Sequence, residues 1–545
     1  MRSSIDLAII FVYLVGTTLF GCSFIFRKGG RDSTGFMTGG GRLPTWAIAL
    51  SVFATFVSSI SFLALPEGAY GPEGWRGWVN SITVPIATVV AAIWFVPFYR
   101  RSTSVSAYSF LEGRFGVWAR VYASACFLVM QSMRSGVILL LLAILVNQLL
   151  GFPCEAIIVI TGLATMLYAM LGGFSAVVWT DAIQSLVLIG GTVVCVVCLV
   201  AGIPDPVGNF QAAFEAGKLS LGALTVTDWS TNTFWVLFSF SICINLQNLG
   251  IDQCYTQRYI AARDERSARR SIFVSAWLYL GVTFLFTLIG TLLWMYGRAN
   301  PGVIPGDVRA AAVFPWFIIH RLPAGVSGLL VSAIIAAAMS TIAATLNSGS
   351  AVLLEDYWKR FARRHANERT NVAFLRVMTA ALAVFSVAIA LGVLWFTRGT
   401  SILSAWWTIL SVFSGGMLGL FLIGAFARRT RSPHALVAVV VGFVLTLWVT
   451  VGQRTLPLAV GFNPNLSIVF ATLSIVGVGW LLGSVLQQVL PERDRDGLGA
   501  VGGADFLEDR VGVLLDARNA DAQLNGDVVV GEPPRDGGED VLLAR

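Results

Sequence analysis

Long apolar stretches separated by short polar segments occupy most of the chain. Thirteen of them are long enough to cross a bilayer, which takes about 20 apolar residues per helix. The runs are continuous and lack the alternation of barrel strands, so they predict helices. The fold class is therefore an all-α polytopic membrane protein of the cell (inner) membrane. Its expected spans are residues 4–25, 44–65, 75–98, 117–150, 154–172, 180–203, 234–252, 271–297, 323–352, 372–397, 401–427, 433–453 and 466–490.

Composition supports this reading. Of 545 residues, 56% are hydrophobic and 12% are charged, whereas about a quarter of a soluble domain is charged. The first apolar run, from Leu7 to Ile25, is longer than the roughly 7–15 residues of a signal-peptide core. Arg27 and Lys28 follow it, as they would follow a spanning helix. We therefore expect a retained first span.

Basic residues concentrate in alternate loops, beginning with Arg27, Lys28, Arg31 and Arg42 after the first span. The positive-inside rule then predicts an N-terminus outside the cell and a cytoplasmic C-terminus. Residues 491–545 hold thirteen Asp and Glu against six Arg and have no long apolar run, which predicts a flexible acidic cytoplasmic tail. The basic membrane part marks cytoplasmic loops and does not indicate a nucleic-acid partner.

Enzymatic chemistry finds little support. The three His are widely separated, and the sequence has neither a zinc-protease motif nor a phosphate-binding loop. Cys195 and Cys198 form a C-x-x-C inside an apolar span, where packing is a better interpretation than redox or metal chemistry. The chain is therefore expected not to be an enzyme. Secondary transport or a channel remains, with a small-molecule solute and the lipid bilayer as partners.

Polar residues inside the spans are the candidates for ion and solute binding. Ala337, Ser340 and Thr341 lie at i, i+3 and i+4, on one face of the ninth span. Neutral hydroxyl and carbonyl oxygens suit a monovalent cation, whereas carboxylates would favour Ca²⁺ or Mg²⁺. The alternative is that these hydroxyls bond backbone carbonyls of their own or a neighbouring helix.

The second span carries Ser58, Ser59 and Ser61 before Pro66. Such a segment can unwind, and its unwinding would free the carbonyls of Ala54 and Val57. Small-residue helix packing is the alternative interpretation.

Charged residues within the spans are few. Arg134 lies in the middle of the fourth span, where an arginine costs at least about 2.5–3.5 kcal/mol on insertion scales, and it serves either an anionic substrate or a buried ion pair. Thr180 and Asp181 are interpreted as the start of the sixth span, with Asp181 in its first turn. The basic stretch 257–271 is expected to form a cytoplasmic surface helix.

Three motifs, in order along the chain, resemble signatures of the sodium:solute symporter family. They are GGFSAVVWTDAIQ (172–184), DQCYTQRY (252–259) and the Ser340-Thr341 pair with Asn347. The resemblance covers roughly residues 1–480. It implies a leucine-transporter-like 5+5 inverted repeat with an extra N-terminal helix and two C-terminal helices, in which the second and seventh spans are broken.

The resulting division has six parts. They are an N-terminal span and cytoplasmic loop (1–43), a first repeat (44–203), an extracytoplasmic loop (204–233), a second repeat (234–427), two C-terminal spans (428–490) and the acidic tail (491–545).

The resemblance also implies a Na⁺ site, made of the carbonyls of Ala54, Val57 and Ala337 with the hydroxyls of Ser340 and Thr341. Asp181 is the candidate ligand of a second ion. Two-sodium members carry Ser just after the Ser-Thr pair, where this chain has Ala343 and Ala344. One coupled Na⁺ is therefore expected.

For the solute, ATFVSSISF (54–62) is similar to bacterial sialic acid symporters. The matching substrate positions are Ser58, Ser61, Asn80 and Arg134, and Asn80 is shorter than the usual Gln. The expected function is sodium-coupled import of a small organic solute, a carboxylate such as sialic acid, by alternating access. A neutral sugar, an amino acid, a monocarboxylate or a vitamin remains an alternative solute, and a transporter-like sensor an alternative function. The oligomeric state is left open.

Overall fold

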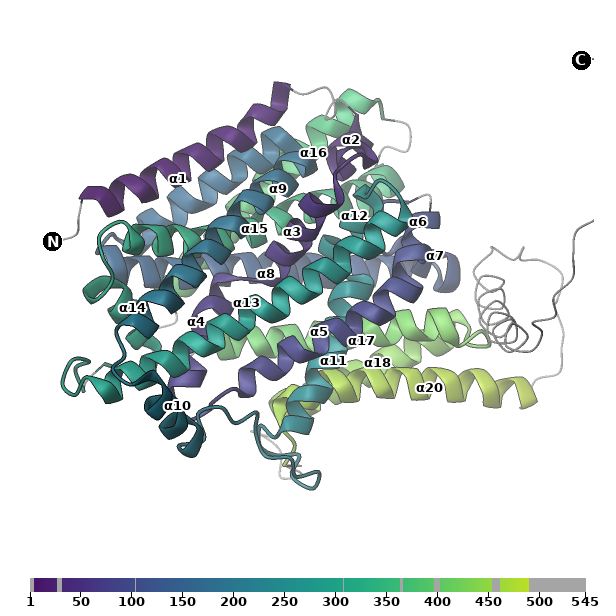
Figure 1. Cartoon of the computed structure of the whole chain (residues 1–545). Coiled ribbons are helices and arrows are strands. Elements are labelled where there is room, and N and C mark those ends of the chain that lie inside the picture. Colours follow the sequence, from purple (N-terminus) through teal and green to yellow (C-terminus); the bar gives the residue numbers. More distant parts are fainter. Residues whose placement is uncertain are drawn as a thin grey trace, which may run out of the picture. The chain divides into compact units, whose positions relative to one another are not determined.

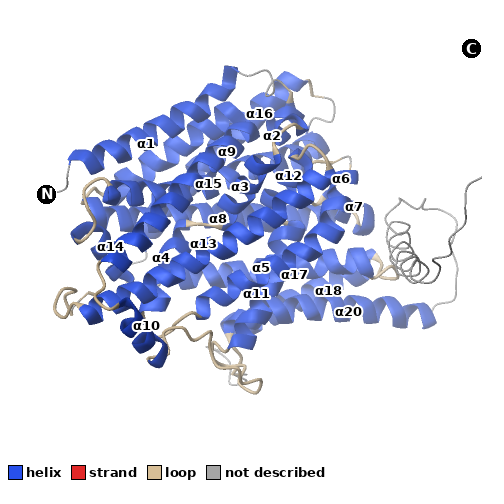
Figure 2. Ribbon diagram, viewed as in Figure 1, coloured by secondary structure: helices blue, strands red, loops and turns tan. Residues whose placement is uncertain are grey.

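The apolar runs form helices, because a backbone in lipid must satisfy its N–H and C=O groups internally. The computed structural model describes residues 4–26, 32–102, 104–306, 308–362, 366–396, 402–452 and 461–489, and the predicted acidic tail lies outside them. Within these ranges the secondary structure is helical (Figure 2), apart from one isolated bridge between Leu43 and Ala262.

The long helices run roughly along one direction (Figure 1). They are α1 (Ser4–Cys22), α3 (Thr45–Phe56), α4 (Ser59–Tyr70), α5 (Val79–Val90), α8 (Val117–Leu150), α9 (Cys154–Ala201), α11 (Phe234–Ile251), α13 (Glu265–Ala299), α15 (Val326–Val352), α16 (Glu368–Phe396), α17 (Ile402–Phe426), α18 (Ser432–Leu447) and α20 (Ser467–Val489). The shorter helices are α2 (Ser33–Thr38), α6 (Val96–Arg101), α7 (Ser109–Phe115), α10 (Pro206–Glu215), α12 (Gln253–Ala261) and α14 (Ala310–His320).

By length and composition, ten helices of the described residues can cross a membrane, or eleven if α3 and α4 count as one bent span. Thirteen were expected, and two helices explain the lower number. The 48-residue α9 covers two of the expected spans. Helix α17 is not counted, because only its Gly415–Phe426 part is considered and that part is a shorter apolar helix. At about 1.5 Å per residue α9 is roughly 72 Å long, more than twice the hydrocarbon core of about 30 Å.

A break inside α9 lies at Gly173, whose φ of +59° and ψ of −157° are not helical. A side chain at this position would meet the backbone and ring of Phe36 from α2 at about 2.9 Å, so glycine is required by both conformation and space. Helix resumes directly after Gly173. The prediction that Thr180 and Asp181 begin a helix is therefore wrong: both are buried in its interior.

Two spans are interrupted, as the family resemblance implies. Between α3 and α4, Val57 (φ −80°, ψ 120°) and Ser58 (φ −114°, ψ 165°) adopt extended conformations, and the two helices meet at 58°. Between α11 and α12, Asp252 (φ −74°, ψ 123°) is extended and its carboxylate caps α12 by accepting from the Cys254 amide at 2.7 Å. Both breaks place polar groups inside the apolar bundle.

Candidate functional site

The break between α3 and α4 frees backbone oxygens in the protein interior. The last carbonyls of a helix have no N–H partner one turn further on. Here the Ser61 amide, which would bond the Val57 carbonyl in a continuous helix, donates to the Ser58 hydroxyl at 3.4 Å instead. The oxygens of Ala54 and Val57 instead face α15. Ala54 is 3% exposed and Val57 is fully buried, so these acceptors are shielded from water.

Two hydroxyls of α15 reach these carbonyls. Ser340 Oγ lies 3.2 Å from the oxygen of Ala54, and Thr341 Oγ1 lies 3.3 Å from that of Val57. Both hydroxyls are also 3.1 Å from the oxygen of Ala337. The structure thus brings the five predicted ion-site residues together as one buried group of neutral oxygens.

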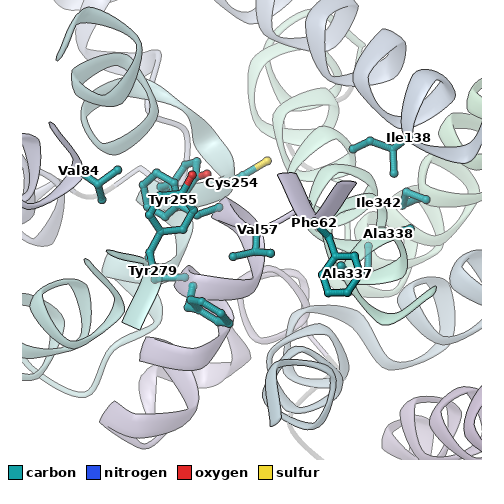
Figure 3. Packing of buried hydrophobic residues seen from close by; sticks show 14 of the residues in the cluster. Val57, Phe62, Val84, Ile138, Cys254, Tyr255, Tyr279, Ala337, Ala338 and Ile342 are labelled. Carbon is teal, nitrogen blue, oxygen red and sulfur yellow. The ribbon is translucent and has the colours of Figure 1, made fainter. Parts of the chain in front are cut away.

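Apolar and aromatic side chains surround this group. Figure 3 shows Val57 with Tyr255 and Tyr279 on one side and Ala337 on the other. The ring of Phe56 packs against Tyr255 and Tyr279 at centroid distances of 4.6 and 5.2 Å. A site enclosed in this way strengthens electrostatic interactions, because the surroundings screen charge less than water does.

Three of the four predicted substrate residues lie at the same break. Ser58 caps α4, and its hydroxyl is 3.5 Å from that of Ser61. Arg134 of α8 donates from Nη2 to the carbonyl of Thr55 at 3.3 Å. No carboxylate of the described residues forms an ion pair with Arg134. This guanidinium is partly exposed and lies next to a helix N-terminus. The Asp252 carboxylate is close enough to interact with its charge electrostatically, without forming an ion pair.

Asn80 is held elsewhere. Its side-chain and backbone oxygens accept from Asn245 Nδ2 of α11, at 3.2 and 3.1 Å, and Asn245 also donates to Thr83 at 2.8 Å. Within the described part of the chain Asn80 has no hydrogen bond to Ser58, Ser61 or Arg134. Sequence reasoning did not identify Asn245. Its position as an amide inside an apolar span was the available signal.

Comparison with known proteins matches this architecture. The model of the sodium:solute symporter family matches residues 36–442. The chain belongs to the sodium:solute symporter family. It is a sodium-coupled, multi-pass membrane transporter of a small-molecule solute, and not an enzyme.

Among relatives of this symporter, the sodium/sialic acid symporter SiaT of Proteus mirabilis is 28% identical over 86% of this chain and 94% of its own length. The sodium/sialic acid symporter NanT of Aliivibrio fischeri is 29% identical over 90% and 95%, respectively. A solved structure of a substrate-bound, outward-open Na⁺-coupled sialic acid symporter superimposes with a TM-score of 0.82 at 27% identity, covering 88% of this chain and 98% of that one. The symporter thus shares that protein's fold.

Asp181, the candidate for a second ion, lies in a buried ion pair. Its Oδ2 accepts from Arg258 Nη2 at 3.0 Å and from the Ser51 hydroxyl at 2.5 Å. Arg258 Nε also donates to Ser51 at 2.8 Å. Arg258 and Asp181 are 1% and 0% exposed. The guanidinium therefore supplies a positive charge at the place where a second cation was considered.

The burial of α12 shows that another prediction is wrong. Its polar side chains are buried, although the stretch from 257 onward was expected on the surface. Gln131 Nε2 donates to Asp252 at 2.5 Å, and Gln253 accepts from the Ala107 amide at 2.8 Å. Gln257 donates to Asn347 at 2.9 Å. These bonds join α12 to the loop before α7 and to helices α8 and α15. Of the basic stretch 257–271, only the part after Ala262 has residues exposed at the surface.

Proposed function

We propose that this symporter carries one Na⁺ together with a small organic carboxylate, of which a sialic acid is the leading candidate. The observation that supports this most is the position of Arg134. At the break where the sodium-site oxygens gather, it places a guanidinium that forms no ion pair among the described residues, although the Asp252 carboxylate is near it.

Na⁺ would be held by the carbonyls of Ala54, Val57 and Ala337 and the hydroxyls of Ser340 and Thr341. All five donors are neutral, so the site gains one positive charge when a monovalent ion binds. A divalent ion would leave two charges in a buried, carboxylate-free environment, which is costly. The hydroxyls now bond these carbonyls, and each can turn its proton away to offer a lone pair.

The substrate carboxylate would bind at the N-terminus of α4. That terminus carries partial positive charge and free amides, both of which favour an anion. The Ser58 and Ser61 hydroxyls can donate to carboxylate oxygens, and Arg134 supplies the countercharge. Asn80 would contribute its amide beyond this carboxylate site.

Arg258 supports a stoichiometry of one sodium, because it neutralises Asp181. Transport of one Na⁺ with one monoanion moves no net charge. Uptake would then forgo the roughly 2.3 kcal/mol per charge that 100 mV of membrane potential supplies. An N-terminus outside and a cytoplasmic C-terminus complete the proposal, on the strength of the basic loops.

Uptake into proteoliposomes under Na⁺ or K⁺ gradients tests the ion site. Ser340→Ala removes one oxygen ligand worth about 1–3 kcal/mol, which raises the Na⁺ concentration for half-maximal uptake about 5- to 150-fold. Ser332→Ala is the matched control, because this buried hydroxyl of α15 bonds its own Gly328 carbonyl at 2.8 Å. An unchanged sodium dependence in Ser340→Ala would refute the assignment.

Substrate class is tested by a thermal-shift panel of sialic acids, monocarboxylates, amino acids, vitamins and neutral sugars, each with Na⁺. We expect an acid to raise the melting temperature of the parent protein. In Arg134→Ala, both this stabilisation and the uptake of the acid should be lost. Arg298→Ala, an exposed arginine of α13, should leave both unchanged. Retained uptake of the acid in Arg134→Ala would make Arg134 structural, and uptake stimulated by membrane potential would contradict a single coupled ion.

A further inference from the structure

The start of α13 extends beyond the apolar part of the membrane. This helix has 35 residues, about 52 Å at 1.5 Å per residue, against a hydrocarbon core of about 30 Å. No charged residue lies between Arg270 and Arg298. The first turns of α13, which carry Arg266 and Arg270, therefore lie at the level of the lipid headgroups.

One face of α13 continues from these arginines into aromatic residues. Arg266, Arg270, Phe273 and Trp277 are spaced by four, three and four residues, so they form a single stripe. Both arginines are exposed, as are Phe273 at 37% and Trp277 at 64%. Basic residues followed by aromatic residues match the change from headgroups to acyl chains.

Two further arginines lie beside this stripe. The bridge between Leu43 and Ala262 brings the chain before α3 next to the chain before α13, and the exposed residues Arg42 and Arg263 each adjoin it. Arg100 holds the turn in place, because its Nη1 donates to the Ala262 carbonyl at 2.6 Å. We call the residues Arg42, Arg263, Arg266, Arg270, Phe273 and Trp277 the elbow surface.

Nearby carboxylates do not neutralise these arginines. Asp264 accepts from the Ser267 amide at 2.6 Å as the cap of α13, and Glu265 pairs with Arg269. Among the described residues, none of the four arginines of the elbow surface is in an ion pair. The surface therefore presents concentrated positive charge above an apolar, lipid-facing stripe.

We propose that the elbow surface binds an anionic phospholipid. Its arginines contact the phosphate, since planar guanidinium groups donate two parallel hydrogen bonds to phosphate oxygens. Phe273 and Trp277 contact the acyl chain. A lipid bound there fixes the junction of α12 and α13 relative to the membrane plane. This site is separate from the sodium and carboxylate sites, so it stands whether or not those assignments hold.

The test measures thermal unfolding of the full chain in neutral detergent during titration with phosphatidylglycerol or phosphatidylcholine. We expect phosphatidylglycerol alone to stabilise, less so at high salt. Each arginine near a membrane surface contributes about 1 kcal/mol, so Arg266→Gln with Arg270→Gln should weaken binding about 30-fold. Arg298→Gln, which removes an exposed charge from the opposite end of α13, should change nothing.

Two further variants separate charge from packing and from folding. Arg266→Lys with Arg270→Lys keeps the charge but loses the paired N–H donors, so it should weaken binding less than the double Gln variant does. Trp277→Ser should weaken binding of the diacyl lipid. Equal stabilisation by both lipids, or an unchanged titration in the double Gln variant, would overturn the proposal. Equal stabilisation by inorganic phosphate would also overturn it, since the site would then not require a lipid.

Discussion

The ion pair between Arg258 and Asp181 joins two helices and should be essential for the stability of the bundle. Arg258 reaches from α12 to Asp181 in α9, and Ser51 of α3 bonds both side chains at 2.8 and 2.5 Å. The Arg258 guanidinium carbon lies 5.7 Å from the centroid of the Phe174 ring, and this ring covers the guanidinium further. Replacing Arg258 with Gln leaves the Asp181 carboxylate buried without a countercharge.

The magnitude follows from burial. Both side chains are at most 1% exposed, and removing one partner of such a pair costs about 3–5 kcal/mol. At roughly 2 °C per kcal/mol, the value for larger chains, this predicts a fall in melting temperature of about 6–10 °C. Removing both charges together costs less than the sum, because no unpaired charge remains buried.

Thermal unfolding of purified protein in Na⁺-free detergent solution measures Arg258→Gln, Asp181→Asn and the double variant. We expect the two changes to be coupled by about 1–3 kcal/mol. The same measurement in Na⁺ distinguishes an ion ligand from a structural acid. A melting temperature of Arg258→Gln within about 2 °C of the parent, or strictly additive effects, would refute this reasoning. A defect of Asp181→Asn seen only in Na⁺ would make Asp181 a sodium ligand.

Two other changes test how the helices are joined. Asp6 of α1 accepts from the amides of Gly325 and Gly328 at 2.7 and 2.9 Å and so caps α15. Asp6→Ala should cost about 1–2 kcal/mol in thermal unfolding, and Asp6→Asn, which keeps an acceptor, clearly less; equal losses would contradict the cap. Gly173→Ala should destabilise by about 1–3 kcal/mol because its positive φ is strained for alanine. Gly190→Ala in the same helix, where a side chain meets nothing within 4 Å, should be neutral, and equal melting temperatures of the two variants would exclude the strain.

The sodium-site residues could be selected from sequence because their geometry is largely local. Ser340 and Thr341 share a face with Ala337 through helix periodicity alone. The serines after Val57 indicate a helix start in an apolar run, and that start releases the preceding carbonyls. Only the meeting of the two segments, 286 positions apart for Ser340 and Ala54, required the family resemblance and then the fold.

Other predictions failed where the tertiary partner decides. Asp181 has the sequence context of a helix start, yet Gly173 moves the break seven residues earlier and leaves the carboxylate in the interior. Arg258 lies in a basic stretch typical of a surface helix, and its burial depends on Asp181, 77 positions away. No local pattern contains such a pairing.

Hydrophobic continuity and helical periodicity by themselves determined that this chain spans a membrane, and they marked the two hydroxyls facing the second span. Both signals operate within one or two turns, so they can be read without knowing the fold. The tertiary structure alone decided which buried polar groups pair with one another. Arg258 forms an ion pair with Asp181, and Asn245 forms hydrogen bonds with Asn80. The tertiary structure also decided that Arg134 lies near the Asp252 carboxylate without forming an ion pair with it among the described residues. A buried charge or amide is stable only beside a suitable partner, and helix packing determines which partner is near.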